Sequence, residues 1–176
     1  IMDLGSSYMR AKDFDSAHSP VKEFDASYLH QTEAFYPVKS KAKKPQPITY
    51  FALALKSPNG YLWEQRPEKG LLANFWMMPL YALTDFKMDS DAQWTQDEMI
   101  AATERRLLID YGVAAKLTVV AGRPVTHVYS HQKWTVTILT ADVENGLDLK
   151  RGLWQTMDQI QRDPQPKVQE KIWQKL

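Results

Sequence analysis

The sequence predicts an α+β sandwich with a mixed sheet, preceded by a short helical segment. The first observation is a stretch of alternating apolar residues at 48–55, followed by an Asn-Gly turn that is typical of hairpins. The second is one long segment at 95–111 with helical spacing, which ends before Gly112. The third is a set of strand-like runs after that helix, at 117–121, 125–130 and 134–141. Strands on both sides of a single helix favour a mixed sheet over a helical bundle.

Side chains of the predicted strands divide between two faces, because successive residues of a strand point in opposite directions. A return strand is expected at 61–66, after the turn. In the first strand Tyr50 lies on one face, and the other face carries Thr49, Phe51, Leu53 and Leu55. In the last strand the two faces carry Trp134, Val136 and Ile138 against Thr135, Thr137 and Leu139.

Helical spacing occurs in three places. Near the amino terminus, Pro20 suits a first helical turn, and an apolar face is expected from Val21, Phe24, Tyr28 and Leu29. In the central helix one stripe is expected to hold Met99, Ala102, Arg106 and Ile109. The last segment, 165–176, has helical spacing through Val168, Ile172 and Leu176.

Composition divides the chain into three parts. Residues 1–31 are predicted to be a small helical segment, and residues 32–47, with three prolines among four lysines, a solvated linker. Residues 48–176 are predicted to form the main domain. A net charge of +1 gives no field over the whole chain, so any contact with nucleic acid must be local. No apolar run reaches the roughly 18 residues of a membrane span, and we expect a soluble, cytoplasmic protein.

The helix before Gly112 resembles the end of the Nudix box, G-x5-E-x7-R-E-U-x-E-E-x-G-U, of Nudix pyrophosphohydrolases. The register places Arg105 on the box arginine and Leu107 on the apolar position. It places Asp91 on the first glycine and Asp97 on the first glutamate, and the remaining glutamate positions hold Arg106, Ile109 and Asp110. Mg²⁺ needs several clustered carboxylate oxygens. The resemblance therefore implies a Nudix-like α/β/α sandwich without pyrophosphohydrolase chemistry; the alternative is an ordinary amphipathic helix that ends at a glycine.

Two further stretches are similar to the carboxy-terminal region of MutY-family adenine DNA glycosylases. Residues 35–45 resemble the F-P-x-K-x-x-K-K-K-P connector of that family, and residues 62–76 resemble its L-x-x-R-P-x-x-G-L-L-x-x-L-W segment. The chain departs from the family at 77–79, where Met-Met-Pro follows in place of the usual W-E-F-P. Lysines of the connector, Lys41 and Lys43 among them, are expected to contact DNA phosphates without reading bases.

Residues 127–131, His-Val-Tyr-Ser-His, resemble the H-x-F-S-H loop that reaches 8-oxoguanine in MutY proteins. The resemblance implies that Ser130 hydrogen-bonds the damaged base, with Tyr129 and His131 beside it. A serine hydroxyl both donates and accepts, so it can read N7 of guanine, which gains a proton when C8 is oxidised. Residue type alone favours an ordinary turn residue for Ser130 and a surface histidine for His131; the surrounding resemblance favours the role in recognition.

The segment after Met2-Asp3-Leu4-Gly5 is similar to the part of MutY that holds a [4Fe–4S] cluster through four cysteines. In this register the four ligand positions hold Met9, Ser16, Ser19 and Asp25. The chain has no cysteine, and iron–sulfur clusters require soft thiolate ligands. We therefore predict no iron–sulfur cluster and no other cofactor, and expect a small apolar plug in its place, built from Tyr8, Phe14, Val21, Phe24 and Tyr28.

Together the resemblances imply the 8-oxoguanine-recognition part of an adenine glycosylase, which removes adenine mispaired with 8-oxoguanine or guanine. The family's catalytic glutamate and aspartate lie upstream of the cluster region, so we expect this chain to be part of a larger enzyme and inactive alone. The expected partners are double-stranded DNA with 8-oxoguanine opposite adenine and the missing amino-terminal catalytic domain, with no membrane. A Nudix-fold nucleotide hydrolase and a protein-binding module are the alternatives.

Overall fold

The computed structural model describes the chain except residues 1, 11, 37, 39–43, 87–93 and 145–147. Its contacts divide the chain into two compact units, Ile1–Lys44 and Pro45–Leu176. Each unit is a separate body and is described by itself. No helix in the described part of either unit is both long and apolar enough to cross a membrane.

The first unit consists of short helical pieces. The α-helices are α1 (Met2–Tyr8) and α2 (Ala26–Leu29), with 3₁₀ turns η1 (Ser16–His18), η2 (Lys22–Phe24) and η3 (Glu33–Phe35). The continuous apolar face predicted after Pro20 is wrong. The Asp25 carboxylate accepts hydrogen bonds from the backbone N–H of Ser27 at 2.9 Å and Tyr28 at 3.3 Å, which makes Asp25 the N-cap of α2 and separates α2 from η2.

The second unit contains one eight-stranded mixed sheet. Its two longest strands, β1 (Gln46–Ser57) and β7 (Gln132–Asp142), lie parallel at the centre, with Gln46 opposite Gln132 and Lys56 opposite Asp142. All other pairs are antiparallel. The remaining strands are β2 (Gly60–Gln65), β3 (Trp76–Met77), β4 (Leu80–Ala82), β5 (Thr118–Val119), β6 (Val125–Val128) and β8 (Leu153–Gln155).

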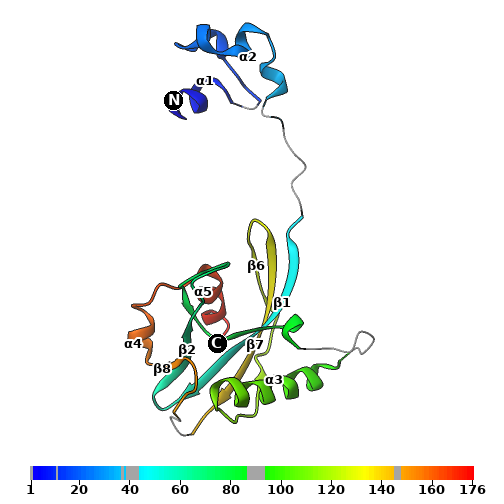
Figure 1. Ribbon diagram of the computed structural model, residues 1–176, viewed down its shortest axis with the longest axis vertical. Coiled ribbons are helices and arrows are strands. Elements are labelled where there is room, and N and C mark those ends of the chain that lie inside the picture. The colour runs from blue at the N-terminus through cyan, green and yellow to red at the C-terminus, as the bar shows by residue number, and fades with distance from the viewer. Residues whose placement is uncertain (1, 11, 37, 39–43, 87–93, 145–147) are drawn as a thin grey trace. The chain divides into compact units, whose positions relative to one another are not determined.

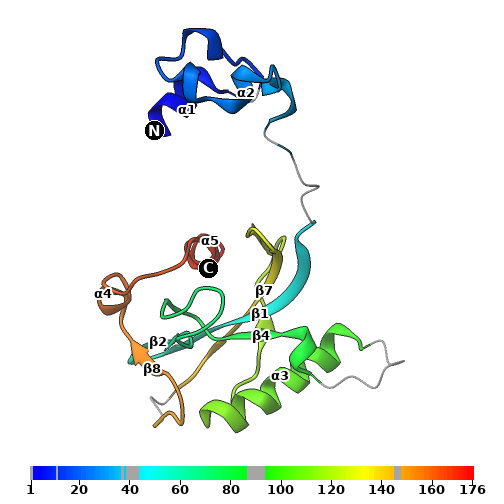
Figure 2. The ribbon, with the colours of Figure 1, turned by 45° about the horizontal axis from the view of Figure 1, so that its top comes forward.

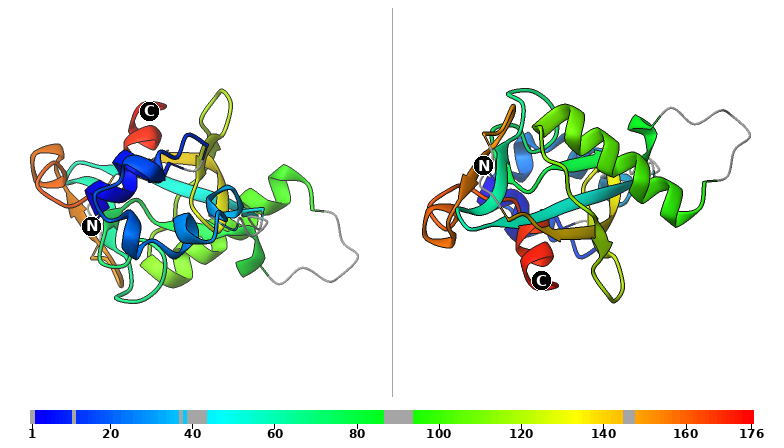
Figure 3. Two further views of the ribbon diagram at one scale, coloured as in Figure 1. Left: turned by 90° about the horizontal axis from the view of Figure 1, so that it is seen from above. Right: turned by 90° about the horizontal axis from the view of Figure 1, so that it is seen from below.

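Helices cover both faces of this sheet (Figures 2 and 3). Helix α3 (Gln96–Tyr111) lies on one face, and the shorter α4 (Met157–Ile160) and α5 (Lys167–Trp173) lie on the other; a 3₁₀ turn, η4 (Leu83–Asp85), follows β4. The predicted alternation of β1 is confirmed: Phe51, Leu53 and Leu55 pack under α3, while Ala52 and Ala54 pack under α4 and α5. The alternation of β7 is confirmed by Trp134, Val136 and Ile138 on the α5 side, with Leu139 under α3.

The ends of α3 follow the sequence signals, but its buried face does not. Thr95 and Glu98 form a reciprocal capping box, and Gly112 ends the helix with φ of 76°. The predicted stripe is wrong at Arg106 and Ile109, which are exposed. The buried residues are instead Ala102, Thr103, Leu107 and Tyr111. Thr103 can enter the core because its hydroxyl donates to the Met99 carbonyl at 2.8 Å, which leaves no unpaired donor.

Candidate functional site

The three residues predicted to read DNA damage form the turn between β6 and β7, referred to here as the β6–β7 turn (Tyr129, Ser130 and His131). The Tyr129 N–H donates to the Gln132 carbonyl at 2.7 Å and closes the turn, and the Gln46 N–H at the start of β1 donates to the His131 carbonyl at 2.9 Å. Ser130 and His131 are exposed, and Tyr129 is half-buried. The backbone of the turn is therefore fixed from two sides, while two of its side chains are free to contact a ligand.

A pocket of about 430 Å³ lies beside this turn. It is lined by the turn, by Gln132, and by Gly70 and Leu71 from the loop at 66–75. That loop closes between the Arg66 N–H and the Phe75 carbonyl at 2.8 Å and holds Gly70, Leu72 and Asn74 at positive φ. Two of the sequence stretches that resemble MutY proteins, 62–76 and 127–131, thus meet at one pocket, although they are about 60 residues apart in the chain.

The rings of His127 and Trp134 pack against Tyr129 of the turn, and the Tyr50 ring packs against Trp134. We call the rings of Tyr50, His127 and Trp134 the aromatic platform. The Trp134 ring, 1% exposed, has its centroid 4.6 Å from the Tyr50 ring and 5.1 Å from the Tyr129 ring. Its indole N–H donates to the Gln132 side-chain oxygen at 2.7 Å. The His127 ring, on the residue opposite Trp134 in β6, lies 4.5 Å from the Tyr129 ring. Because these rings hold Tyr129 in place, the position of Ser130 depends on Trp134 and His127.

Three buried polar atoms near the platform have no hydrogen-bond partner among the described residues: Arg66 Nε, His127 Nδ1 and Tyr129 Oη. Burial raises the pKa of the Tyr129 phenol to about 12, so the phenol remains a proton donor at neutral pH. Burial, and then the charge on Lys171, lowers the pKa of His127 and favours the neutral imidazole. Unpaired buried polar atoms are costly in a folded protein, which makes this group a candidate for binding a polar ligand.

Sequence reasoning gave no role to Arg66, Trp134 or His127. The Arg66 guanidinium lies over the Trp134 ring, 5.9 Å from its centroid, and none of the ion pairs in the described part of the chain involves it. The available signal was the Arg-Pro pair at 66–67 within the segment that resembles MutY proteins. The two linker lysines of the predicted site, Lys41 and Lys43, lie outside the described residues.

The degenerate Nudix box does not fit a metal ion. Asp110 accepts a hydrogen bond from Tyr81 Oη at 2.9 Å and pairs with Arg106 Nε at 2.8 Å. Asp97 lies thirteen residues earlier on the same helix, about 20 Å along its axis, and cannot join Asp110. Asp91 lies outside the described residues. Among the residues that the structure describes, no three His, Cys, Asp or Glu side chains form a group that could hold a metal.

A second carboxylate near this helix is also neutralised. Glu64 accepts a hydrogen bond from Tyr111 Oη at 2.7 Å and pairs with Arg151 Nε at 2.8 Å. The Arg151 guanidinium also lies over the Tyr111 ring, 5.7 Å from its centroid. Asp110 of α3 and Glu64 of β2 therefore tie α3 to the sheet, and each carboxylate is already paired with an arginine and a tyrosine.

In the first unit, the four positions that correspond to cluster ligands have structural roles. Ser16 and Ser19 are buried; the Ser16 hydroxyl donates to Glu33 Oε1 at 2.7 Å, and the Ser19 hydroxyl accepts from the Val21 N–H at 3.4 Å. Met9 forms an isolated bridge, and Asp25 caps α2. The prediction of an apolar plug is wrong within this unit. Three of its five expected members, Phe14, Val21 and Phe24, are exposed, and the Phe24 side chain is 88% exposed. Short capped turns cannot align these residues on one buried face.

Comparisons with known proteins place the fold. Residues 50–175 match the model of the family described as NUDIX domain. The carboxy-terminal domain of mouse MUTYH, solved with human PCNA, is similar with a TM-score of 0.52 and 18% identity, over 72% of this chain and 85% of that one.

Two other solved structures are similar. A MutT protein from Methanosarcina mazei Go1 has a TM-score of 0.54 and 13% identity over 75% of this chain and 96% of that one. The NUDIX domain of Shewanella oneidensis NrtR, complexed with ADP ribose, has a TM-score of 0.53 and 13% identity over 86% of this chain and 95% of that one. At these identities the likeness concerns the fold. No curated protein sequence matched the chain. The family match spans more than half of the sequence, and the chain belongs to the NUDIX domain family.

Proposed function

We propose that this Nudix domain is the lesion-recognition part of an adenine DNA glycosylase that acts on adenine opposite 8-oxoguanine or guanine. The observation that carries the proposal is the pocket where the β6–β7 turn meets Gly70 and Leu71. An exposed hydroxyl stands there on a backbone held from two sides, next to unpaired buried polar atoms. The parent enzyme would hydrolyse the N-glycosidic bond, and this chain would supply recognition without excision.

In this proposal Ser130 reads the N7 edge of the damaged guanine. Ordinary guanine offers an acceptor at N7, whereas oxidation at C8 places a proton there. A serine hydroxyl would then accept a hydrogen bond from the lesion, and it could rotate to donate to other groups of the base. Tyr129 and His131 would flank the base, and Lys41 and Lys43 would contact phosphates and contribute affinity that falls as salt rises.

The competing function, a nucleotide pyrophosphohydrolase, is disfavoured by the pairing of Asp110 with Arg106 and Tyr81 and of Glu64 with Arg151 and Tyr111. A metal-dependent hydrolase would need several clustered carboxylate oxygens that are not already paired in this way. Replacing Arg106 by glutamate would leave Ile109 and the Glu64 pair unchanged, so one substitution is not expected to restore activity.

Two assays on the 176-residue chain separate the two functions. We expect fluorescence anisotropy to show tighter binding to a duplex with 8-oxoguanine opposite adenine than to the same duplex with guanine opposite adenine. We expect no turnover of 8-oxo-dGTP with Mg²⁺ or Mn²⁺, for the chain or for Arg106→Glu. Equal affinity for the two duplexes would contradict lesion recognition, and metal-dependent turnover above background would support the hydrolase instead.

A further inference from the structure

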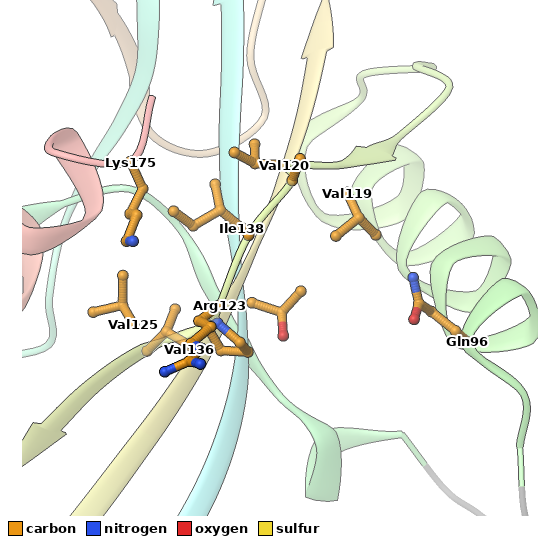
Figure 4. Close-up of a pocket in the computed structure, with 12 residues that line it drawn as sticks. Gln96, Val119, Val120, Arg123, Val125, Val136, Ile138 and Lys175 are labelled. Carbon is orange, nitrogen blue, oxygen red and sulfur yellow. The ribbon is translucent and has the colours of Figure 1, made fainter.

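Helix α5 and the turn after it carry lysines near β6. The Lys171 ammonium donates to the Thr126 carbonyl at 2.9 Å, which fixes the helix against the strand. Lys175 follows in the turn just after the helix ends at Trp173. Arg123, in the loop between β5 and β6, lines with Lys175 a pocket of about 260 Å³. Figure 4 shows these two side chains at the pocket, carried by different elements. We refer to Arg123, Lys171 and Lys175 as the basic ridge.

The charges of the basic ridge are not neutralised by carboxylates. In the described part of the chain, the acidic residue of α5, Glu170, pairs with Lys167, and none of the ion pairs involves a ridge residue. The loop before Arg123 contributes no acidic side chain, and a Cβ atom built on Gly122 would meet no atom within 4 Å, so the backbone beside Arg123 is open. The charge on Lys171 also helps to lower the pKa of His127, after burial.

The pocket between the ridge cations is not suited to membrane insertion. Val119, Val120 and Val125 line it; Val125 is 4% exposed and the other two are partly buried, so none of the three is a fully exposed apolar side chain. A membrane-binding surface needs apolar side chains that project among its cations. Cations that no carboxylate pairs with suit the phosphates of a nucleic-acid strand, which bind through charge.

We propose that the basic ridge binds the sugar–phosphate backbone of the same DNA duplex whose lesion the β6–β7 turn contacts; this inference rests on the function proposed above. Arg123 and Ser130 are seven residues apart in the sequence, beyond the two ends of β6. At about 3.3 Å per residue, Arg123 is up to about 23 Å from the reading residue, or about six to seven base-pair steps. The ridge would set the register of the duplex, and the turn would read the base.

The test measures the affinity of the 176-residue chain for duplexes at several salt concentrations. Arg123→Gln/Lys175→Gln removes two ridge charges, and Lys56→Gln/Arg105→Gln removes two charges from the far end of β1 and from α3 as the matched control. Lys171 is kept because it bonds to Thr126. For the ridge variant we expect affinity roughly tenfold lower at 0.1 M salt and a log–log salt slope flatter by about 1.8, as for two lost phosphate contacts.

The ridge variant is expected to keep the wild-type ratio of affinities for lesion and undamaged duplexes. Two shortened duplexes, each cut to roughly four base pairs on one side of the lesion, remove the phosphates that the ridge would contact from one of them only. With that duplex the wild-type chain and the ridge variant should bind with equal affinity, and with the other duplex the difference in affinity should remain. If the control loses as much affinity as the ridge variant, or if the ridge variant instead loses binding to phosphatidylserine vesicles, the ridge is not a DNA contact. If the wild-type chain prefers the lesion duplex and the ridge variant binds duplexes with wild-type affinity and salt dependence, the proposal for the ridge alone is refuted. A ridge effect without lesion preference would refute the proposed function alone, and a wild-type chain that binds no duplex would refute both.

Discussion

Trp134→Ala is expected to lower the free energy of unfolding by about 3–5 kcal/mol and to abolish preference for the lesion duplex. The ring is 1% exposed and is packed between Tyr50 and Tyr129, so its removal leaves a cavity directly beneath the β6–β7 turn. The lost indole N–H also releases Gln132, which lines the pocket beside the turn. Stability and recognition should therefore be lost together.

Urea denaturation of the 176-residue chain measures the first effect, and duplex binding at low denaturant measures the second. Trp134→Phe serves as the graded variant, because it keeps a ring under Tyr129 and loses the hydrogen bond to Gln132. We expect Trp134→Phe to lower the free energy of unfolding by about 1 kcal/mol for the lost hydrogen bond, in addition to the loss from the smaller buried apolar area. A Trp134→Ala chain that is as stable as the wild type, or that still distinguishes the lesion, would show that the ring does not support the turn.

Gly60→Ala is expected to destabilise the second unit by about 2–4 kcal/mol. Gly60 ends the β1–β2 turn with φ of +114°, and an added Cβ would lie 2.0 Å from the Gln155 carbonyl oxygen of β8. Since that oxygen belongs to the backbone, the two strands would have to separate. The substitution thus combines backbone strain with a clash that no side-chain rotation relieves.

Gly122→Ala is the matched control, because Gly122 has the same φ of +114° but open space around its Cβ position. It should cost only the backbone strain, about 1 kcal/mol. The difference between the two midpoints in thermal or urea unfolding measures the steric contribution of β8. Equal losses for the two variants would mean that β2 and β8 do not approach as closely as described.

The sequence predicts those parts of the fold that depend on short-range patterns. The two faces of β1 follow from the alternation of Phe51, Leu53 and Leu55 with small residues, because strand geometry alone fixes it. The ends of α3 follow from Thr95 and Gly112, which satisfy backbone groups within a few residues.

Features that depend on partners distant in the sequence could not be predicted in this way. The buried face of α3 includes Thr103, whose polarity is hidden by a bond to Met99, while Ile109 is left exposed. In the first unit, capping by Asp25 outweighs the helical spacing around it. The pocket at Gly70 and the β6–β7 turn requires two segments about 60 residues apart to meet, and no local pattern encodes that contact.

The basic ridge has a partial signal in the sequence. Lys167, Lys171 and Lys175 recur every four residues, which indicates one side of a helix. Pairing of Lys167 with Glu170 removes one of the three, and Arg123 joins the others only through the tertiary fold. A stripe of like charges in a sequence therefore does not show which of its members remain available to a ligand.

The central claim, that the β6–β7 turn reads the lesion, is tested most directly by the ratio of dissociation constants for guanine·adenine and 8-oxoguanine·adenine duplexes, compared between the wild-type chain and Ser130→Ala. Loss of one neutral hydrogen bond of about 0.5–1.5 kcal/mol predicts a ratio about 2- to 12-fold smaller in Ser130→Ala. Ser7→Ala, the same change at an exposed serine of the first unit, should keep the wild-type ratio. A Ser130→Ala chain that binds both duplexes as the wild type does, or that weakens on both equally, would contradict the assignment of this turn as the lesion reader.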